Sequence, residues 1–586
     1  MKSLLHLYRF LKPYRIQAIL ALILLLGMVA ADLVIPHLTR RIIDQGIMPK
    51  DIRVVIVTAL YMVGASLLSA ILALFNNYLS VQAAMGFGAQ LRSALMRKVQ
   101  SFSFGNLDKL QTGKLVVRST SDVTMVAMIV MLSLRILTRA PIWTAGAIVL
   151  LVYTSPGLGW IMAVFVPLII VLMWIFANRA QSMFLELQQR LDRLNTVLQE
   201  NLAGIRVVKA FVRTAHETAR FGKVNETLMD KTIRASQLTA VFMPFLLLLV
   251  NLAIVTAVWM GGKRAMAGTM TTGQVVAAIN YLSFALFPIL LLGGMVGPLA
   301  AAAASAGRIL EILETTPCVK AKKNAVKPSR ISGRISFEDV FFKYGTNGGD
   351  PVLSHIQFTA EPGETIAVLG ATGSGKSTLV HLIPRFHDVS SGRITLDGMD
   401  IRNMDLGQLR SLIGMALQEA VLFSGTVGDN IRYGRMSSSD EEVRQAARVA
   451  QADDFILALP HGYDTMVGQR GVTLSGGQCQ RISIARALLV KPRILILDDS
   501  TSALDMETER RFQDALNRLI LSLEKPVTRF VIAQRISTVT QADRILLLDQ
   551  GRIAAAGTHS ELLASNVLYQ GICRSQLGAL QETGHV

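Results

Sequence analysis

Cysteine is scarce in this chain of 586 residues. Its three cysteines, Cys318, Cys479 and Cys573, lie far apart, which excludes both a disulfide framework and a zinc cluster. The first residues, MKSLLHLYRFLKPYR, contain no small-residue cleavage site, so we expect no removable signal peptide. They favour an interfacial helix that leads into a membrane. The sequence also lacks solenoid-type repeats and low-complexity tracts.

Acidic residues are also few, with 41 Asp and Glu against 59 Lys and Arg, which gives a formal net charge of +18. Such a charge is compatible with nucleic-acid binding. However, 51% of the residues are hydrophobic, and they gather in the first half of the chain. Basic residues in the cytoplasmic loops of a membrane protein explain the charge more simply. We therefore expect a lipid bilayer, and no nucleic acid, as the partner of this chain.

The first half contains six stretches long and apolar enough to cross a bilayer, which requires roughly 20 residues each. The connections between the second and third stretches and between the fourth and fifth are long, charged and compatible with helices. Their basic residues place both connections in the cytoplasm. The sequence thus predicts six transmembrane helices, at residues 16–38, 54–79, 125–153, 158–177, 239–261 and 274–299.

A few polar side chains lie within these predicted spans, where they are rare because burying them in lipid is unfavourable. Each is a candidate for a substrate cavity or for pairing between helices, and we favour pairing for the two arginines. The residues are Asp32, Arg135, Arg139, Asn251 and Asn280.

Residues 316–333 contain Pro and Lys and are typical of a linker. The hydrophobic pattern of the sequence changes after this segment. Beyond it, short apolar runs such as Thr365–Leu369 and Ile494–Leu497 alternate with helical patterns, as in an α/β domain. We therefore expect a transmembrane domain at 1–315 and a second, α/β domain at 334–586, because the chain exceeds the length of one domain.

A P-loop pattern follows the apolar strand TIAVL and precedes the helix-compatible run STLVHLI. The glycines allow backbone N–H groups to surround phosphate oxygens, Lys376 supplies positive charge, and the Ser377 hydroxyl is a ligand for Mg²⁺. Asp498 ends a second apolar strand, ILILD, from which its carboxylate can reach the same metal. The predicted phosphate-binding residues are Gly370, Ala371, Thr372, Gly373, Ser374, Gly375, Lys376, Ser377 and Thr378.

Between these motifs lies the pentapeptide Leu474, Ser475, Gly476, Gly477, Gln478, which is the signature sequence of ABC ATPases. With the P-loop and Asp498 in the same order, the second domain resembles that family, which implies ATP and Mg²⁺ as cofactors. The resemblance implies that Tyr344 stacks on adenine and that Gln418 is the Q-loop residue, a metal ligand beside Ser377 and Asp498. It also implies a D-loop at Ser502, Ala503, Leu504 and Asp505.

The membrane half resembles the exporter branch of the ABC family, in which both domains are fused in one half-transporter. The fold class implied is a membrane domain with six transmembrane helices and an α/β P-loop NTPase domain with a helical subdomain. Residues 113–118 and 200–209 resemble the intracellular loops, which carry coupling helices that dock on the ATPase domains. The implied location is the bacterial inner membrane, with the ATPase domain in the cytoplasm.

Two positions depart from an active ABC ATPase, which has Glu after the Walker B aspartate and His as the switch residue. This chain has Asp499 and Gln534 there. Asp499 is one methylene shorter than Glu, whereas a general base needs a reach of about 2.6 to 3.2 Å. Gln534 carries no positive charge towards the γ-phosphate. A third departure, Gln469 where exporters commonly have Glu, lies in the segment before the signature.

In the family, each ATP lies between the P-loop of one ATPase domain and the signature of the other. This chain therefore resembles the degenerate-site subunit of heterodimeric bacterial multidrug exporters, and we expect a related half-transporter with Glu and His as its partner. The expected cargo is an amphipathic small molecule. A homodimeric lipid or peptide exporter and an importer with the exporter fold remain alternatives. The predicted membrane spans argue against a soluble ABC ATPase of DNA repair or translation.

Overall fold

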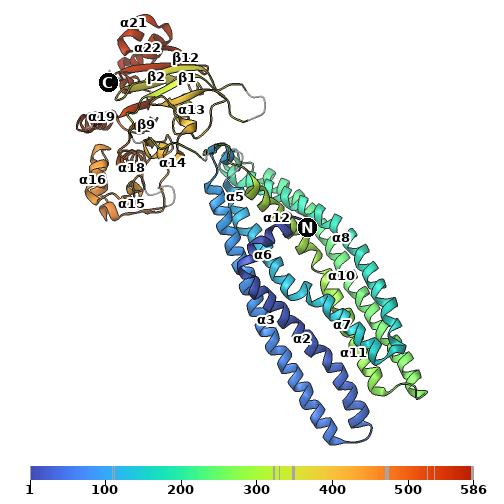
Figure 1. Cartoon of the computed structure of the whole chain (residues 1–586). Coiled ribbons are helices and arrows are strands. Elements are labelled where there is room, and N and C mark those ends of the chain that lie inside the picture. The colour runs from blue at the N-terminus through green and yellow to red at the C-terminus, as the bar shows by residue number, and fades with distance from the viewer. Residues whose placement is uncertain are drawn as a thin grey trace. The chain divides into compact units, whose positions relative to one another are not determined.

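The computed structural model describes residues 2–108, 110, 112–320, 322, 324–328, 330–345, 350–468, 474–523, 525–533 and 535–582. The chain separates into two compact units (Figure 1). One unit consists of Met1–Gln100 and Thr112–Thr315 and is helical. The other consists of Ser101–Gln111 and Thr316–Val586 and contains the β-sheets.

Among the described residues, six helices of this unit are long and apolar enough to cross a membrane, which confirms the prediction of six transmembrane helices. The sixth predicted span, 274–299, runs past the end of its helix at Gly293. In lipid, only a helix satisfies the backbone hydrogen bonds of a single segment, so continuous apolar stretches adopt this form. The candidate spans are Ser3–Ile47, Ile52–Gln100, Gly113–Thr154, Pro156–Ala203, Thr214–Met266 and Thr272–Ile289.

Several of these helices are longer than a bilayer is thick. Helix α3, Ile52–Gln100, has 49 residues, and at about 1.5 Å per residue it measures about 74 Å. The hydrocarbon core is about 30 Å thick, so more than half of the length of α3 exceeds what is needed to cross it. The other helices of this unit are α1 (Lys2–Leu7), α2 (Arg15–Arg41), α5 (Thr112–Val117), α6 (Val123–Leu132), α7 (Arg139–Thr154), α8 (Trp160–Ala203), α9 (Ile205–Ala210), α10 (Thr214–Met266), α11 (Thr272–Gly293) and α12 (Val296–Glu314).

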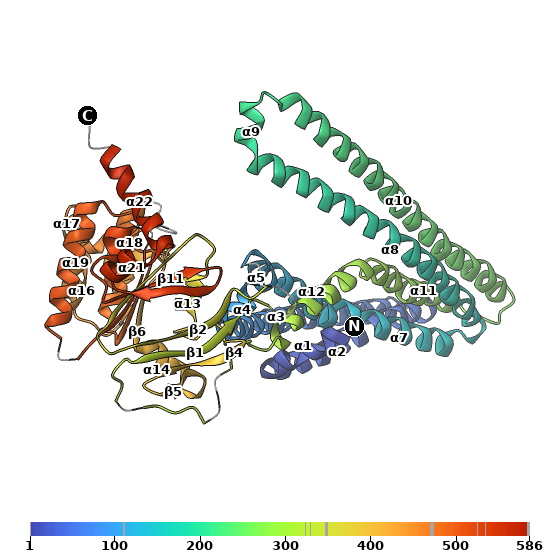
Figure 2. The same cartoon turned by 90° about the horizontal axis from the view of Figure 1, so that it is seen from above.

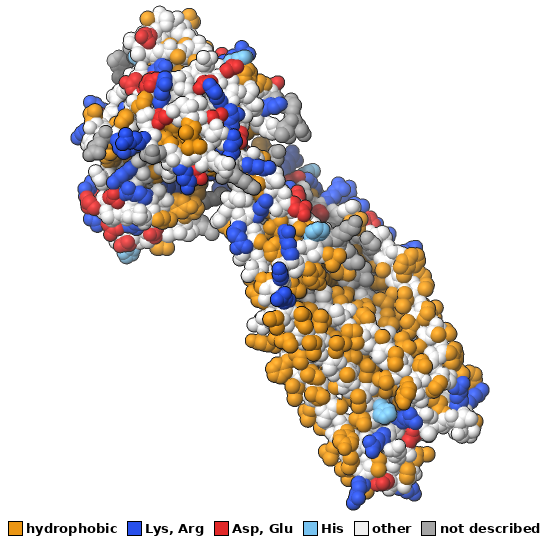
Figure 3. All heavy atoms as spheres, viewed as in Figure 1, with side chains coloured by type: hydrophobic (Ala, Val, Ile, Leu, Met, Phe, Trp, Pro, Cys, Tyr) orange, Lys and Arg blue, Asp and Glu red, His pale blue; other side chains and the backbone are white. Residues whose placement is uncertain are grey.

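The surface of the helical unit is largely apolar. Leu60, Leu74, Val149 and Trp174 are all well exposed, and hydrophobic side chains cover the middle of the helices, with charged groups towards their ends (Figure 3). A soluble protein rarely exposes so large an apolar patch. The described part of the chain therefore has the surface of a multi-pass membrane protein.

One cluster of polar groups inside the membrane unit is paired between helices. Arg139 on α7 lies 3.2 Å from a carboxylate oxygen of Asp32 on α2, and Ser69 on α3 donates a hydrogen bond of 2.5 Å to the same carboxylate. The Arg139 guanidinium also lies 4.1 Å from the centre of the Trp143 ring. The contact places Arg139 in an interhelical pair, as we expected for this arginine.

A second ion pair joins α12 to the π-helical turn Arg118–Asp122. The Asp122 side chain is buried and accepts hydrogen bonds from Ser305, at 2.8 Å, and from the Arg308 Nε, at 2.9 Å. Arg118, one helical turn before Asp122, pairs with Glu311, one turn after Arg308, at 3.0 Å. These two pairs hold together segments that are far apart in the sequence.

The second unit contains two main β-sheets (Figure 2). The larger has the strand order β12-β11-β3-β10-β9-β6, parallel except for the edge strand β12. The smaller is antiparallel, with the order β2-β1-β4-β5. The bounds are β1 (Ile335–Phe342), β2 (Leu353–Ala360), β3 (Thr365–Gly370), β4 (Ser391–Leu396), β5 (Met399–Asp400), β6 (Ile413–Ala416), β7 (Gly425–Thr426), β8 (Met466–Val467), β9 (Ile494–Asp498), β10 (Thr528–Ile532), β11 (Arg544–Asp549) and β12 (Arg552–Gly557).

Helices cover the larger sheet, and a group of them between β6 and β9 forms the helical subdomain. The fully buried strands β3 and β9 read as continuous apolar runs, as expected for parallel strands that are covered on both faces. The helices are α13 (Lys376–His381), α14 (Leu406–Ser411), α15 (Val427–Arg432), α16 (Asp440–Val449), α17 (Asp453–Leu457), α18 (Gly476–Leu489), α19 (Met506–Leu521), α20 (Ile536–Val539), α21 (His559–Ser565) and α22 (Val567–Glu582).

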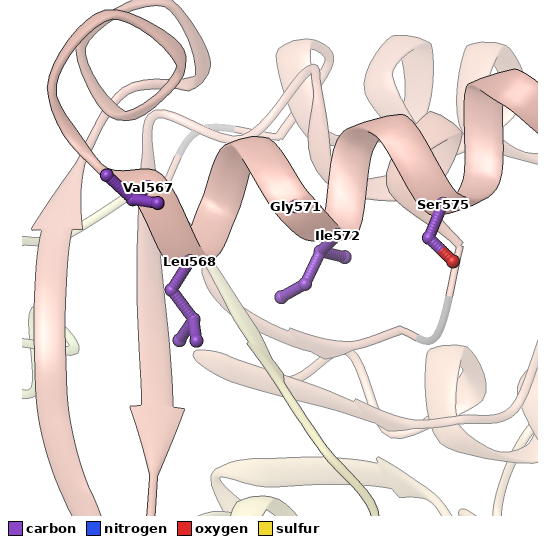
Figure 4. A pocket seen from close by; sticks show the side chains of 5 residues that line it. All are labelled: Val567, Leu568, Gly571, Ile572 and Ser575. Atoms are coloured by element: carbon purple, nitrogen blue, oxygen red, sulfur yellow. The ribbon is translucent and has the colours of Figure 1, made fainter.

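The C-terminal helix α22 presents an apolar side. Val567, Leu568, Ile572 and Ser575 lie along it and line a surface hollow of about 690 Å³ (Figure 4). The residues described as lining it carry no charge, so the hollow differs in chemistry from the phosphate-binding motifs of the same unit.

A short helix from the N-terminal half belongs to the sheet-containing unit. Helix α4, Phe104–Leu107, packs there through a stack of Phe104 on Phe386, with ring centres 4.2 Å apart. The Asn106 side chain accepts a hydrogen bond of 2.8 Å from the Cys318 backbone and donates one of 3.0 Å to the Thr316 carbonyl. We name the segment Ser101–Gln111 the docking segment. It directly precedes residues 113–118, where the sequence indicated the first intracellular loop.

We predict that Asp122→Ala lowers the stability of the membrane unit by about 2 kcal/mol, because it removes the charge-assisted hydrogen bonds from the half-exposed Arg308 and the bond from the buried Ser305 hydroxyl. The measurement is thermal unfolding of the detergent-solubilised chain, followed by tryptophan fluorescence. Glu226→Ala, on an exposed part of α10, serves as the control and should leave the midpoint unchanged. Equal unfolding midpoints for the two variants would show that the pair of Asp122 and Arg308 contributes nothing to stability.

Candidate nucleotide site

The P-loop connects β3 to α13 in a conformation that requires glycine. Gly373 and Gly375 have φ angles of +83° and +100°, in the left-handed region. A Cβ atom on Gly375 would also lie 2.8 Å from a methyl group of Leu353. The loop can therefore turn its N–H groups towards one point, as the sequence pattern predicted.

A cavity of about 350 Å³ lies at this loop. It brings together residues that the sequence places far apart: most of the P-loop, Gln418 after β6, and Asp499 after β9. Two lining residues, Val352 and Ile532, had no signal in the sequence, since each is an ordinary apolar residue near a strand. The lining consists of Val352, Thr372, Gly373, Gly375, Lys376, Ser377, Thr378, Gln418, Asp499 and Ile532.

Lys376 is held over the P-loop by backbone acceptors. Its Nζ donates hydrogen bonds of 2.9 Å to the carbonyls of both Gly370 and Ala371. Burial lowers the pKa of the Lys376 ammonium, and the carboxylates of Asp499 and Asp498 oppose that shift. The loop therefore presents a partly desolvated cation, which interacts more strongly with an anion than a fully hydrated one does.

Another polar atom of the loop is available for a ligand. Ser374 is buried, and its Oγ has no hydrogen-bond partner within the described ranges. A buried hydroxyl without a partner is unfavourable unless a ligand or water satisfies it. Together with Lys376, this hydroxyl makes the loop suited to phosphate oxygens.

Asp498 lies at the end of β9, with 2% of its surface exposed. One carboxylate oxygen accepts a hydrogen bond of 2.9 Å from the Ser377 hydroxyl. The other accepts one of 3.0 Å from Nε2 of His381. His381 was not singled out by the sequence analysis, although its position one turn after Ser377 places both residues on the same face of α13.

Asp499 follows directly and is also buried, at 7% exposure. Its backbone has a φ of +48°, and its N–H donates a hydrogen bond of 3.0 Å to the Ile532 carbonyl. Its carboxylate accepts a hydrogen bond of 3.3 Å from Gln418. Gln418 therefore both lines the cavity and contacts Asp499. The other two departures of the sequence, Gln534 and Gln469, lie outside the described residues.

Tyr344 lies beside the P-loop helix. Its hydroxyl and that of Thr378 are 3.1 Å apart, within hydrogen-bond distance. Its ring meets Phe342 and His387 edge to face, at 4.8 and 5.2 Å between ring centres. The ring is half exposed. The role of Tyr344 in stacking on adenine stays a prediction.

The signature residues lie at the start of α18, away from this cavity. Ser475 caps the helix by accepting a hydrogen bond from the Gln478 backbone, while the Gln478 side chain bonds back to Ser475. None of Leu474, Ser475, Gly476, Gly477 and Gln478, all of which are described, lines the cavity at the P-loop. The signature therefore contributes nothing to the phosphate cavity of its own chain.

The residues of the predicted D-loop contact both Asp499 and helix α18, which begins with the signature. The Ser502 hydroxyl donates a hydrogen bond of 2.8 Å to the Asp499 carbonyl, and the Ala503 N–H donates one of 3.1 Å to the Gln480 side chain. Gly477 approaches so closely that a Cβ atom on it would lie 2.9 Å from the Ala503 carbonyl. Asp505 caps α19, and hydrogen bonds from Thr508 lower the pKa of its carboxyl. The loop thus links Asp499 mechanically to the signature helix.

Comparisons with known proteins agree with this arrangement. Residues 18–289 match the model of the ABC transporter transmembrane region, and residues 353–502 match that of the ABC transporter. The ABC transporter ATP-binding protein YfiB of Bacillus subtilis is 42% identical over 97% of this chain and 98% of its own length. The ATP-dependent lipid A-core flippase of Syntrophus aciditrophicus is 38% identical over 81% of this chain and 78% of its own length.

The fold is also found among solved structures. A bacterial Atm1-family ABC exporter with ATP bound has a TM-score of 0.83 and 27% identity, over 96% of this chain and 98% of its own. The chain belongs to the ABC transporter family. It is a multi-pass membrane protein that binds ATP and couples its hydrolysis to export, which confirms the family, fold class and ATPase activity predicted from the sequence.

We predict that Lys376→Met weakens ATP binding by at least about tenfold, since the variant loses a charge-assisted contact worth about 1.5 to 3 kcal/mol. Equilibrium binding of a fluorescent ATP analogue to the detergent-solubilised chain measures the change. Lys525→Met removes an exposed lysine and should bind the analogue as the unaltered chain does. Unchanged affinity in Lys376→Met would contradict the assignment of the phosphate site.

Proposed function

We propose that this chain is the degenerate-site subunit of a heterodimeric ABC exporter. In this proposal a related half-transporter carries Glu and His at the positions of Asp499 and Gln534, and its P-loop faces the signature of this chain. The complex exports amphipathic small molecules across the bacterial inner membrane. The ATPase unit lies in the cytoplasm, and the site at Lys376 holds ATP but hydrolyses it slowly.

The geometry of Asp499 is the observation that carries the proposal. An aspartate carboxylate is retracted by about one C–C bond, or about 1.5 Å, relative to the Glu of an active ATPase, while proton abstraction needs a heavy-atom distance of about 2.6 to 3.2 Å. The Asp499 backbone is fixed by its bond to Ile532, and its carboxylate already accepts a hydrogen bond from Gln418. The short side chain therefore lacks a way to recover the missing reach.

The separation of the signature from the P-loop cavity supports pairing with a second chain. An ATP bound at Lys376 would have no contact with Ser475 of the same chain, because the signature lies outside the cavity. In this family the two motifs meet when two ATPase domains associate head to tail. The intact signature of this chain would then complete the hydrolytic site of its partner.

The donors at the cavity fit Mg²⁺, which prefers oxygen ligands. Ser377 and Gln418 line the cavity and offer a hydroxyl and an amide oxygen. Asp498 does not line it, but its buried carboxylate accepts a hydrogen bond of 2.9 Å from Ser377. We propose that these three residues hold the ion. When bound, it would neutralise the charge of the phosphates.

The expected cargo class is supported by an apolar cavity in the membrane unit. This cavity has a volume of about 420 Å³, and its lining includes Ile148, Val166, Met173 and Thr144. The Thr144 hydroxyl donates a hydrogen bond of 2.9 Å to the Ala285 carbonyl, so the lining offers mainly apolar contact. The similarity to a lipid A-core flippase makes a lipid the second candidate cargo.

We predict that Asp499→Glu combined with Gln534→His raises the ATPase rate of the purified chain at least tenfold, which corresponds to about 1.4 kcal/mol in the barrier. The double variant restores the reach of the base and the switch imidazole. Release of phosphate by the reconstituted protein measures the rate. Asp549→Glu, at the exposed end of β11, adds the same methylene elsewhere and should change nothing.

The proposal also requires that the unaltered chain hydrolyses ATP slowly. If it forms a homodimer with full, cargo-stimulated ATPase activity, or if the double variant is no faster, the degenerate-site assignment is wrong.

We further predict that an affinity-tagged copy of this chain, purified from its native membrane, carries a second ABC half-transporter in equal amount, with Glu and His at the two positions. Mass spectrometry of the intact complex identifies the pair. Recovery of the tagged chain only as a homodimer would contradict the heterodimer and favour the homodimeric lipid or peptide exporter.

A further inference from the structure

The carboxylate of Asp498 is held from two sides. Ser377 binds one oxygen, as the family pattern requires of a metal ligand, whereas His381 binds the other. An ionised carboxylate only accepts hydrogen bonds, so the imidazole Nε2 is the donor. Neither His381 nor Asp498 lines the cavity at the P-loop, whereas Ser377 does. His381 is therefore connected to the cavity through Asp498 and Ser377.

The His381 ring is itself fixed by aromatic contacts. It meets the edge of Phe386 at 5.8 Å between ring centres, and Phe386 stacks at 4.2 Å on Phe104 of the docking segment. The Arg410 guanidinium lies 5.5 Å from the centre of the Phe386 ring. A continuous series of contacts thus leads from the docking segment through Phe386 and His381 to Asp498.

We propose that His381 is a positioning residue, which orients Asp498 for Mg²⁺ and is itself kept in place by the stack of Phe386 on Phe104. This rests on the proposal that Mg²⁺ binds at Ser377 and Asp498. A side chain that fixes a metal ligand raises the affinity for the metal without touching it, and its removal typically lowers that affinity about 10- to 100-fold. The contact would join the metal site to the docking segment by a route that does not involve Gln418.

The test is a Mg²⁺ titration of the full chain, solubilised in detergent and saturated with the trinitrophenyl derivative of ATP. The fluorescence of the nucleotide gives the half-saturating Mg²⁺ concentration, and binding in EDTA gives the affinity without metal. We expect His381→Leu to raise the half-saturating concentration at least about tenfold, with little change in EDTA. His381→Gln, whose amide nitrogen reaches as far as Nε2, should stay within about threefold of the unaltered chain.

Two further variants separate this role from general packing. Phe386→Leu keeps His381 but loosens its ring, so we expect a rise larger than that of His381→Gln and smaller than that of His381→Leu. His355→Leu is the matched control, because His355 also bonds to an aspartate, Asp339 at 2.8 Å, but both of these side chains are largely exposed. It should leave the Mg²⁺ titration unchanged.

Each outcome decides the proposal. If Mg²⁺ strengthens binding to the unaltered chain and does so equally in His381→Leu, His381 does not position Asp498. If Mg²⁺ has no effect on the unaltered chain, the metal site itself is wrong and the positioning role is lost with it. If His381→Leu no longer binds nucleotide in EDTA, the fold is disturbed, and the titration of His381→Gln then decides: a normal value supports the role and a tenfold rise overturns it.

Discussion

The buried carboxylate of Asp498 is the point around which the phosphate pocket is organised. Transfer of a carboxylate from water to a protein interior costs several kcal/mol unless hydrogen bonds compensate it. Here Ser377 and His381 each donate one, and both come from α13. The helix that begins at the P-loop is thereby tied to the end of β9, and the two motifs that define the family keep their relative positions.

Strand order explains why these motifs meet. In the larger sheet β10 lies between β3 and β9, and all three are parallel, with Ile532 opposite both Val368 and Asp498. The carboxyl ends of parallel strands meet at the same edge of a sheet, which is where ligands of α/β proteins bind. Asp499 follows β9 at this edge and contacts Ile532 and Gln418. Asp499 therefore lies where several fixed segments converge, which is why the proposed function treats its shorter side chain as decisive.

Much of this architecture could be predicted from the sequence because it depends on local patterns. The six membrane helices follow from apolar runs, and the P-loop follows from its glycines with Lys376 and Ser377. Contacts between residues that are far apart in the sequence left no such pattern. Helix α4 is a four-residue element without a strong pattern, and its place in the sheet-containing unit depends on the stack of Phe104 on Phe386. His381 looks like an ordinary helical residue until β9 places Asp498 beside it.

The two units share a design in which single polar contacts fix long, otherwise apolar elements. Asp32 and Arg139 join α2 to α7 within the membrane unit, and Asp122 with Arg308 joins the turn Arg118–Asp122 to α12. In the ATPase unit, Asp498 joins the end of β9 to α13 in the same way. The carboxylates of Asp122 and Asp498 are buried, so either would be unfavourable there without its partners.

The central claim is that the site of this chain retains ATP while its partner hydrolyses it. The most direct measurement is photo-crosslinking of an azido-ATP to the complex during steady turnover, followed by separation of the two chains and analysis of the nucleotide on each. The account predicts mainly triphosphate on this chain and mainly diphosphate on its partner. Diphosphate on this chain, at the level found on the partner, would contradict it.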